Sequence, residues 1–114
     1  ADAPMLCTKD VLWFWDIYLR DDADRTDPRA TPSNSESLAG LPPAFVLTAE
    51  TDPLRDDAES FGAALQDAGN HVVAKRYPGV FHGFFTMPML TRSKTAIADA
   101  ARFLSRRFAQ RPPV

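Results

Sequence analysis

The chain has 114 residues, of which 45% are hydrophobic and 25% are charged, a composition typical of one small globular domain. Its 13 Lys and Arg residues are nearly balanced by 15 Asp and Glu residues, and both signs are spread along the whole chain. This distribution offers no basic surface for a phosphate backbone, so nucleic acid is excluded as an expected partner.

The lone cysteine, Cys7, cannot form a disulfide within the chain, which favours a reducing compartment and a cytoplasmic location. No stretch approaches the roughly 20 apolar residues that a membrane-spanning helix needs, and the first residues do not resemble a signal peptide. The chain also starts without methionine. We therefore expect no membrane span, and we expect that the chain was cut or truncated from a longer protein.

Residues 8–19 carry apolar side chains at spacings of three and four, which predicts an amphipathic helix with Thr8 as its N-cap. The apolar stripe is so wide that the helix should be buried against other elements or face a hydrophobic pocket. A place in the helix core is favoured over a substrate pocket for four aromatic side chains, namely Trp13, Phe14, Trp15 and Tyr18.

Residues 21–43 hold four of the ten prolines and almost no apolar periodicity, so an extended loop is predicted. A loop of this length is uncommon in a compact domain unless it is functional or lies along a larger body. The loop lacks the glycine and the terminal glutamate of a calcium-binding motif. A solvated acidic turn is therefore expected for Asp21, Asp22, Asp24 and Asp27.

Residues 44–49 form a continuous apolar run, which is typical of a strand buried on both faces of a parallel sheet. Asp52-Pro53 then opens a helix, with an acid at the N-cap and proline at the first helical position, and Gly69-Asn70 ends it. A second strand is predicted over residues 71–77, with Pro78-Gly79 as its end.

The last apolar repeat has helical spacing over residues 91–108, and this helix is expected to cover one face of the sheet. Strand, helix and strand in this order form a right-handed βαβ unit. The predicted fold class is therefore α/β, with parallel strands flanked by helices.

Two residues with catalytic chemistry follow the carboxyl ends of the predicted strands, where ligands and catalytic groups gather in open parallel sheets. These residues are Asp52 and His82. A carboxylate on one imidazole nitrogen leaves the other nitrogen able to act as a general base. The local pattern also fits a simpler pair of roles, in which Asp52 caps a helix and His82 is a turn residue packed between Phe81 and Phe84. Spacing alone leaves both interpretations open.

Other candidates for chemistry are weaker. No serine is flanked by glycines both two positions before and two positions after it, so the G-x-S-x-G nucleophile motif is absent, as is a His-Gly-Gly motif. Cys7 is interpreted as a structural thiol and His71 as a solvated turn residue. No cluster of Cys and His indicates a metal, and no glycine-rich loop indicates a phosphate-bearing cofactor.

Residues 38–88 resemble the acid and histidine region of bacterial esterases and lipases of the hormone-sensitive-lipase type, which are α/β-hydrolases. The resemblance continues upstream through LWFWDIYL and downstream into the last helix. It implies that TDPLRDD, residues 51–57, supplies the catalytic carboxylate at Asp52. It likewise implies that VFHGFF, residues 80–85, supplies the catalytic base at His82. Arg55 and Asp57 are implied to support the site.

The resemblance implies a serine carboxylic-ester hydrolase that acts on small-molecule esters without a cofactor. Residues 1–114 would be the C-terminal fragment of a single α/β-hydrolase domain, comprising an aromatic helix (1–20), an extended loop (21–43) and a strand-helix-strand-helix unit (44–114). The nucleophilic serine and the oxyanion motif would lie in the missing N-terminal half. The isolated chain is therefore expected to be inactive.

An alternative from another functional class is a non-catalytic module that binds an apolar ligand or a partner chain through an exposed sheet edge. A two-stranded parallel unit buries little surface, and an unpaired edge invites strand addition. Self-association or binding of the missing N-terminal half is therefore expected in either case.

Overall fold

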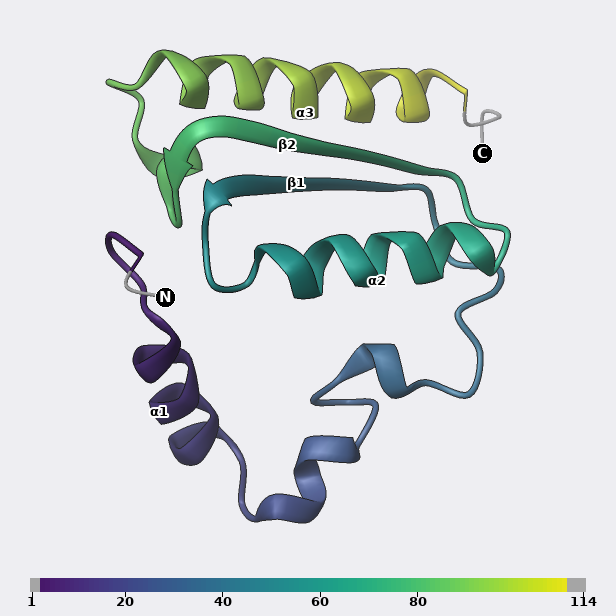
Figure 1. The fold of residues 1–114 in the computed structure, drawn as a ribbon. Coiled ribbons are helices and arrows are strands. Elements are labelled where there is room, and N and C mark those ends of the chain that lie inside the picture. Colours follow the sequence, from purple (N-terminus) through teal and green to yellow (C-terminus); the bar gives the residue numbers. More distant parts are fainter. Residues whose placement is uncertain (1–2, 111–114) are drawn as a thin grey trace.

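The computed structural model describes residues 3–110. Its elements in chain order are α1 (Thr8–Tyr18), η1 (Asp22–Thr26), η2 (Pro32–Asn34), β1 (Ala44–Thr51), α2 (Arg55–Asp67), β2 (Val72–Phe81), η3 (Phe84–Thr86) and α3 (Thr91–Ala109). The strands β1 and β2 lie side by side, with α2 on one side of them and α3 on the other (Figure 1). This layering confirms the predicted α/β class and the last helix as a cover for one face of the sheet.

The two strands are parallel and pair in a simple register from Ala44 with Val72 to Ala49 with Tyr77. The register then shifts, because Thr51 pairs with Phe81. The prediction that Pro78-Gly79 ends the second strand is therefore wrong. Gly79 has φ 72°, a conformation that glycine adopts without steric cost, so the chain bulges at this point and the strand continues.

The core lies between the sheet and α3 and contains Ala49, Tyr77, Val80, Phe84 and Ala96. Tyr77 is 1% exposed, and its hydroxyl donates a hydrogen bond to the Asp99 carboxylate over 2.8 Å. Burial, together with the negative charge of Asp99, raises the pKa of the Tyr77 hydroxyl well above its usual range. The hydroxyl therefore stays protonated and connects β2 to α3.

The opposite face of the sheet is covered by α2, which approaches it closely. Gly62 lies so near β1 that a Cβ atom at this position would meet Val46 Cγ2 at 3.3 Å. The absence of a side chain at Gly62 thus allows the helix to pack directly on the strand.

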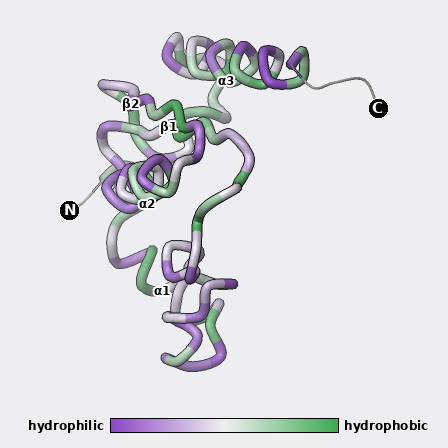
Figure 2. Tube along the Cα trace, turned by 90° about the vertical axis from the view of Figure 1, so that its right-hand side faces the viewer, coloured by the Kyte–Doolittle hydropathy of each residue, from purple (hydrophilic) through white to green (hydrophobic). Residues whose placement is uncertain are grey.

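The helix α1 lies apart from the sheet and its flanking helices (Figures 1 and 2). None of its residues is buried, and Trp13 and Ile17 are 58% and 61% exposed. Of the two expectations for its broad apolar stripe, burial against other elements is thus wrong within residues 3–110, and the other, a hydrophobic pocket, is considered with the site below. The reason is physical: periodicity identifies an apolar face but does not supply the surface that covers it.

The segment before β1 is more structured than the predicted extended loop, because it contains the 3-10 helices η1 and η2. Three of the four acids of the predicted solvated turn are paired with arginines, and the fourth, Asp21, accepts a hydrogen bond from the Ala23 N–H. The shortest bonds join Asp22 to Arg25 (2.9 Å), Asp24 to Arg20 (2.7 Å) and Asp27 to Arg29 (2.6 Å).

Two helix starts also differ from expectation. The N-cap of α1 is Cys7, not Thr8, and the Cys7 N–H donates to the Asp10 carboxylate over 2.8 Å. The helix α2 begins at Arg55 with Leu54 as its N-cap, so Asp52 and Pro53 precede the helix.

Within residues 3–110, no helix combines the length and the apolar character needed to cross a membrane.

Candidate active site

Asp52 and His82, 30 residues apart in the sequence, are hydrogen-bonded to each other. The Oδ2 atom of Asp52 lies 2.9 Å from Nδ1 of His82. Asp52 directly follows the last residue of β1, and His82 directly follows the last residue of β2. The carboxyl ends of the two parallel strands therefore bring the acid and the histidine to one edge of the sheet, as the sequence indicated.

The bulge in β2 determines which residue of the chain comes opposite Asp52. The three residues of β1 from Ala49 to Thr51 span the same length as the five residues of β2 from Tyr77 to Phe81. In the unshifted register, Asp52 would lie across from Val80. With the bulge, the position across from Asp52 is that of His82, so the two extra residues create the pair.

The Asp52 carboxylate uses both of its oxygens. Oδ1 accepts a hydrogen bond from the Leu54 N–H over 2.9 Å, while Oδ2 contacts His82. The side chain is only 13% exposed. Asp52 therefore closes the turn between β1 and α2 and does not cap α2. The predicted N-cap role is wrong in this detail, although the residue still binds a backbone N–H near the helix start.

The segment that follows His82 is fixed to the core. Gly83 follows with φ 82°, a left-handed conformation that glycine adopts readily, and Phe84 is 2% exposed in the core. The fully buried Ser93 of α3 donates its hydroxyl to the Phe85 carbonyl over 2.8 Å. The loop is thus anchored to the core, while the His82 side chain remains 41% exposed.

An apolar hollow of about 370 Å³ lies beside the histidine. Its lining comprises Leu6, Val11, Phe14, Trp15, Tyr18, Leu54 and His82. Three of the four aromatic residues of α1, namely Phe14, Trp15 and Tyr18, thus face a hollow. The sequence pattern had favoured a place in the helix core for them. Val11 belongs to the apolar stripe for which a hydrophobic pocket was one expectation. Sequence reasoning missed Leu6 and Leu54, although the position of Leu54 two residues after the acid was an available signal.

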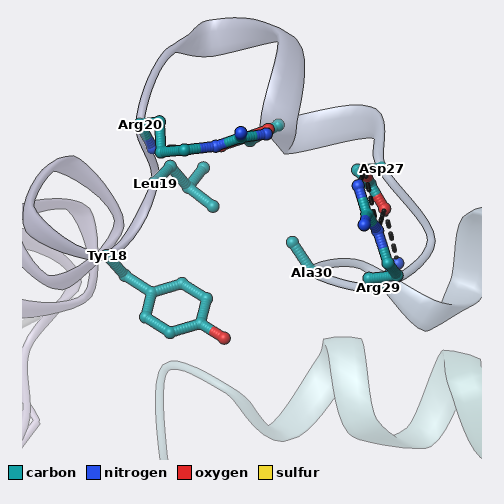
Figure 3. A pocket seen from close by; sticks show the side chains of 7 residues that line it. Tyr18, Leu19, Arg20, Asp27, Arg29 and Ala30 are labelled. Atoms are coloured by element: carbon teal, nitrogen blue, oxygen red, sulfur yellow. Dashed lines mark hydrogen bonds and ion pairs between the residues drawn. The ribbon is translucent and has the colours of Figure 1, made fainter.

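A second hollow, of about 410 Å³, lies between the end of α1 and the loop that follows (Figure 3). Arg29 and Asp27 pair across its rim, and the hydrogen bonds from Arg29 lower the pKa of Asp27 to about 2. Arg20 and Asp24 form a similar pair. Since neighbouring side chains neutralise one another here, this hollow presents no group prepared for acid–base chemistry.

His71 lies at the other end of β2, far from the acid–histidine pair in the sheet. Its ring stacks on Phe103 with centroids 6.5 Å apart, and its Nε2 contacts Nη2 of Arg107. His71 is thus exposed, as expected of a turn residue, but its side chain also contacts two residues of α3.

Cys7 is a free, partly buried thiol. Residues 3–110 contain no group of three His, Cys, Asp or Glu side chains arranged to hold a metal ion.

The geometry defines a class of protein. A carboxylate that holds Nδ1 of an imidazole selects the tautomer and stabilises the imidazolium, so that Nε2 is available to exchange a proton with a substrate or nucleophile. An acid and then a histidine, each after a strand of a parallel sheet, is the order found in α/β-hydrolases. The α/β fold and the Asp52–His82 pair at the carboxyl edge of the sheet therefore both indicate an α/β-hydrolase.

Comparison with known proteins assigns the family. The chain belongs to the α/β-hydrolase fold family, whose model matches residues 1–86. It corresponds to the C-terminal part of an α/β-hydrolase of the hormone-sensitive-lipase type. The family resemblance inferred from the acid and histidine blocks is thus confirmed.

Individual relatives are esterases. The chain is 44% identical over 84 residues to the carboxylic ester hydrolase LipN of Mycobacterium tuberculosis. This match covers 73% of the chain and 22% of LipN. It is 35% identical over 103 residues to an acetyl esterase of Salmonella paratyphi A, covering 90% of this chain and 32% of that one. The chain thus spans between about a fifth and a third of the length of these curated relatives.

A solved structure extends the similarity to nearly the whole chain. EstE1, a thermophilic and thermostable carboxylesterase cloned from a metagenomic library, matches with a TM-score of 0.87 and 35% sequence identity. The match covers 98% of this chain and 37% of EstE1. The segment around α1, which lies outside the layered unit, therefore also belongs to the family's architecture.

Proposed function

We propose that this chain supplies the acid and the base of a Ser-His-Asp triad in a carboxylic ester hydrolase. The observation that carries the proposal is the 2.9 Å bond between Asp52 Oδ2 and His82 Nδ1 beside an apolar hollow. The esterases among the relatives support it. In this proposal the chain is part of a single α/β-hydrolase domain, and the remainder of that domain is its partner.

In the proposed reaction, His82 Nε2 accepts the proton of a serine hydroxyl as its oxygen attacks the ester carbonyl. The same nitrogen then donates the proton to the departing alcohol, which leaves an acyl-enzyme that water hydrolyses by the same route. Asp52 orients the imidazole and stabilises its charged form. The serine and the oxyanion donors come from the remainder of the domain, because no residue of this sequence matches their motifs.

The apolar hollow beside His82 suits the hydrocarbon part of a small ester. Its side chains are aromatic and aliphatic, and its volume of about 370 Å³ fits an ester with a short or medium acyl chain. Lipase activity on longer chains is not required by this geometry. A cytoplasmic location also stays a proposal, and its support is the free thiol of Cys7.

The test uses a complete hydrolase domain that contains this chain, assayed with p-nitrophenyl acetate. Asp52→Asn and His82→Ala should each lower kcat by about 10³-fold to 10⁴-fold, the usual consequence of disabling a triad member. Asp67→Asn, at the exposed end of α2, and His71→Ala, at the far end of β2, are the matched controls. Full activity in Asp52→Asn or His82→Ala would refute the assigned roles.

The isolated chain should not turn over the same ester, because the serine and the oxyanion donors contribute the acyl-enzyme chemistry and the main electrostatic stabilisation. The measurement compares the wild-type chain with its own His82→Ala variant. Turnover above that of the variant would contradict the division of the triad between this chain and the rest of the domain.

A second candidate function is a non-catalytic binding module, and the exposed apolar face of α1 favours it. Trp13, Ile17 and Tyr18 are 58%, 61% and 74% exposed. In that case the chain alone should bind an apolar partner, and His82→Ala should leave binding unchanged. The ester hydrolase remains preferred, because a binding module does not require an aligned carboxylate and imidazole.

A further inference from the structure

Glu50 contacts the bulge that creates the acid–histidine pair. Its side-chain Oε2 atom accepts a hydrogen bond from the Gly79 N–H over 2.8 Å. Glu50 lies between Ala49 and Thr51, where the register of β1 shifts, and Gly79 lies in the extra segment of β2. The bond therefore crosses the sheet at the irregularity itself.

Glu50 is also held through its backbone. Its carbonyl oxygen accepts a hydrogen bond from Nη1 of Arg55 over 2.7 Å. Arg55 is the first residue of α2, and its Nε donates to Asp56 over 2.7 Å. The start of α2 thus fixes the backbone from which the Glu50 carboxylate extends, so the carboxylate meets Gly79 from a defined position.

Loss of the hydrogen bond between Glu50 and Gly79 should affect the position of β2 relative to β1 more than the stability of the fold. Gly79 is exposed, so water can replace the carboxylate as acceptor if Glu50 is lost. What water cannot do is hold β2 at a fixed distance from β1. Because the two extra residues place His82 across from Asp52, a shift of the bulge would move the imidazole relative to the carboxylate.

We propose that Glu50 is a positioning residue for His82. Its carboxylate fixes the bulge at Gly79 and thereby keeps Nδ1 of His82 within hydrogen-bond distance of Asp52. The catalytic consequence rests on the proposed ester hydrolase, whereas the structural consequence does not. The two are therefore tested by separate measurements.

The structural test uses the 114-residue chain and three variants of Glu50. Glu50→Gln keeps a side-chain acceptor at the same reach, Glu50→Asp keeps the charge but shortens the reach, and Glu50→Ala removes both. Glu36→Ala, in the exposed part of the segment before β1, is the matched control. NMR provides two readouts: hydrogen exchange of the Gly79 amide, and the Nδ1 proton and nitrogen signals of His82.

If Glu50 holds the bulge, Glu50→Ala and Glu50→Asp should speed exchange at Gly79 by about tenfold or more, as loss of a hydrogen bond to a charged group predicts. The Nδ1 signals of His82 should move towards those of an Asp52→Asn variant. Glu50→Gln and Glu36→Ala should resemble the wild type. Three results would overturn the proposal: a wild-type Gly79 amide without protection, His82 signals unchanged in Glu50→Ala, or Glu50→Asp behaving as wild type while Glu50→Gln does not.

The catalytic test uses the complete hydrolase domain. A displaced imidazole should lower kcat in Glu50→Ala by up to about 10²-fold with little change in KM, because misplacement of a catalytic group affects the chemical step. Glu50→Gln should restore most of the activity. Failure of the proposed function appears instead as full activity in His82→Ala, whatever the Glu50 variants do. Full activity in Glu50→Ala together with loss in His82→Ala would refute only the positioning role.

Discussion

Gly83 illustrates how one residue affects the site without touching a reacting group. It has φ 82° directly after His82, and apart from Gly83 itself and its two chain neighbours no residue has an atom within 4 Å of the place where a Cβ would be. A side chain at Gly83 would thus meet no obstacle. The cost of a substitution is that of the backbone conformation alone, which L residues with a Cβ rarely adopt.

Gly83→Ala should destabilise the fold by about 1 kcal/mol and shift the imidazole of His82, since relief of the strain changes the adjacent backbone. Gly40→Ala is a matched control, because Gly40 has φ 73°, equally open surroundings and a place in the loop before β1. Urea denaturation should show similar losses for both variants. Only Gly83→Ala should alter the NMR signals of His82, and equal effects of both variants on His82 would contradict this prediction.

At the scale of elements, α2 is attached to the sheet by Glu59. The Thr48 hydroxyl of β1 donates to Glu59 Oε1 over 2.7 Å, and Nε of Arg76 in β2 donates to the same oxygen over 2.8 Å. The hydrogen bonds from Arg76, and then the one from Thr48, lower the pKa of Glu59 from 4.5 to about 2. One carboxylate therefore joins three elements while it is ionised.

This arrangement predicts an acid dependence of stability. The folded-state pKa of Glu59 is depressed, so its stabilising contribution is present above about pH 4.5 and is lost as the pH falls towards 2. Glu59→Gln should flatten the fall of unfolding free energy over that range. Urea denaturation of the chain at several pH values measures the slope, with Glu36→Gln as the control. An unchanged slope in Glu59→Gln would show that the ion pair does not contribute.

For the molecule as a whole, the amount of surface left uncovered is the main physical feature. The sheet has two strands, so each has one edge that no other described strand pairs with. The apolar side of α1 is exposed as well, with Leu12, Trp13 and Ile17 each more than half accessible. Exposed edges and contiguous apolar side chains both favour association.

We predict that the isolated chain self-associates at micromolar concentrations. Replacing Trp13 and Ile17 together by Lys should reduce the association, because charged side chains on α1 oppose burial of its apolar side. Replacing Thr95 and Ala98 by Lys on the exposed side of α3 is the matched control. Light scattering coupled to size-exclusion chromatography measures the mass. A wild-type monomer at high concentration would contradict the prediction.

Local patterns in the sequence were enough to determine the α/β class, the strand at residues 44–49 and the last helix, but they left the roles of Asp52 and His82 open. Each of these depends on signals that neighbouring residues carry themselves, such as the apolar run of β1 or the helical repeat of α3. The blocks around Asp52 and His82 also carried the family resemblance. Sequence alone left open whether Asp52 and His82 meet.

The tertiary structure decided the register and the burial, because both depend on residues far apart in the chain. Pro78-Gly79 has the local pattern of a strand end, yet pairing with β1 turns it into a bulge that moves His82 across from Asp52. The stripe of α1 has the local pattern of a buried face, yet within residues 3–110 much of it remains uncovered. A periodic pattern specifies which face is apolar, and only packing between elements determines what that face meets.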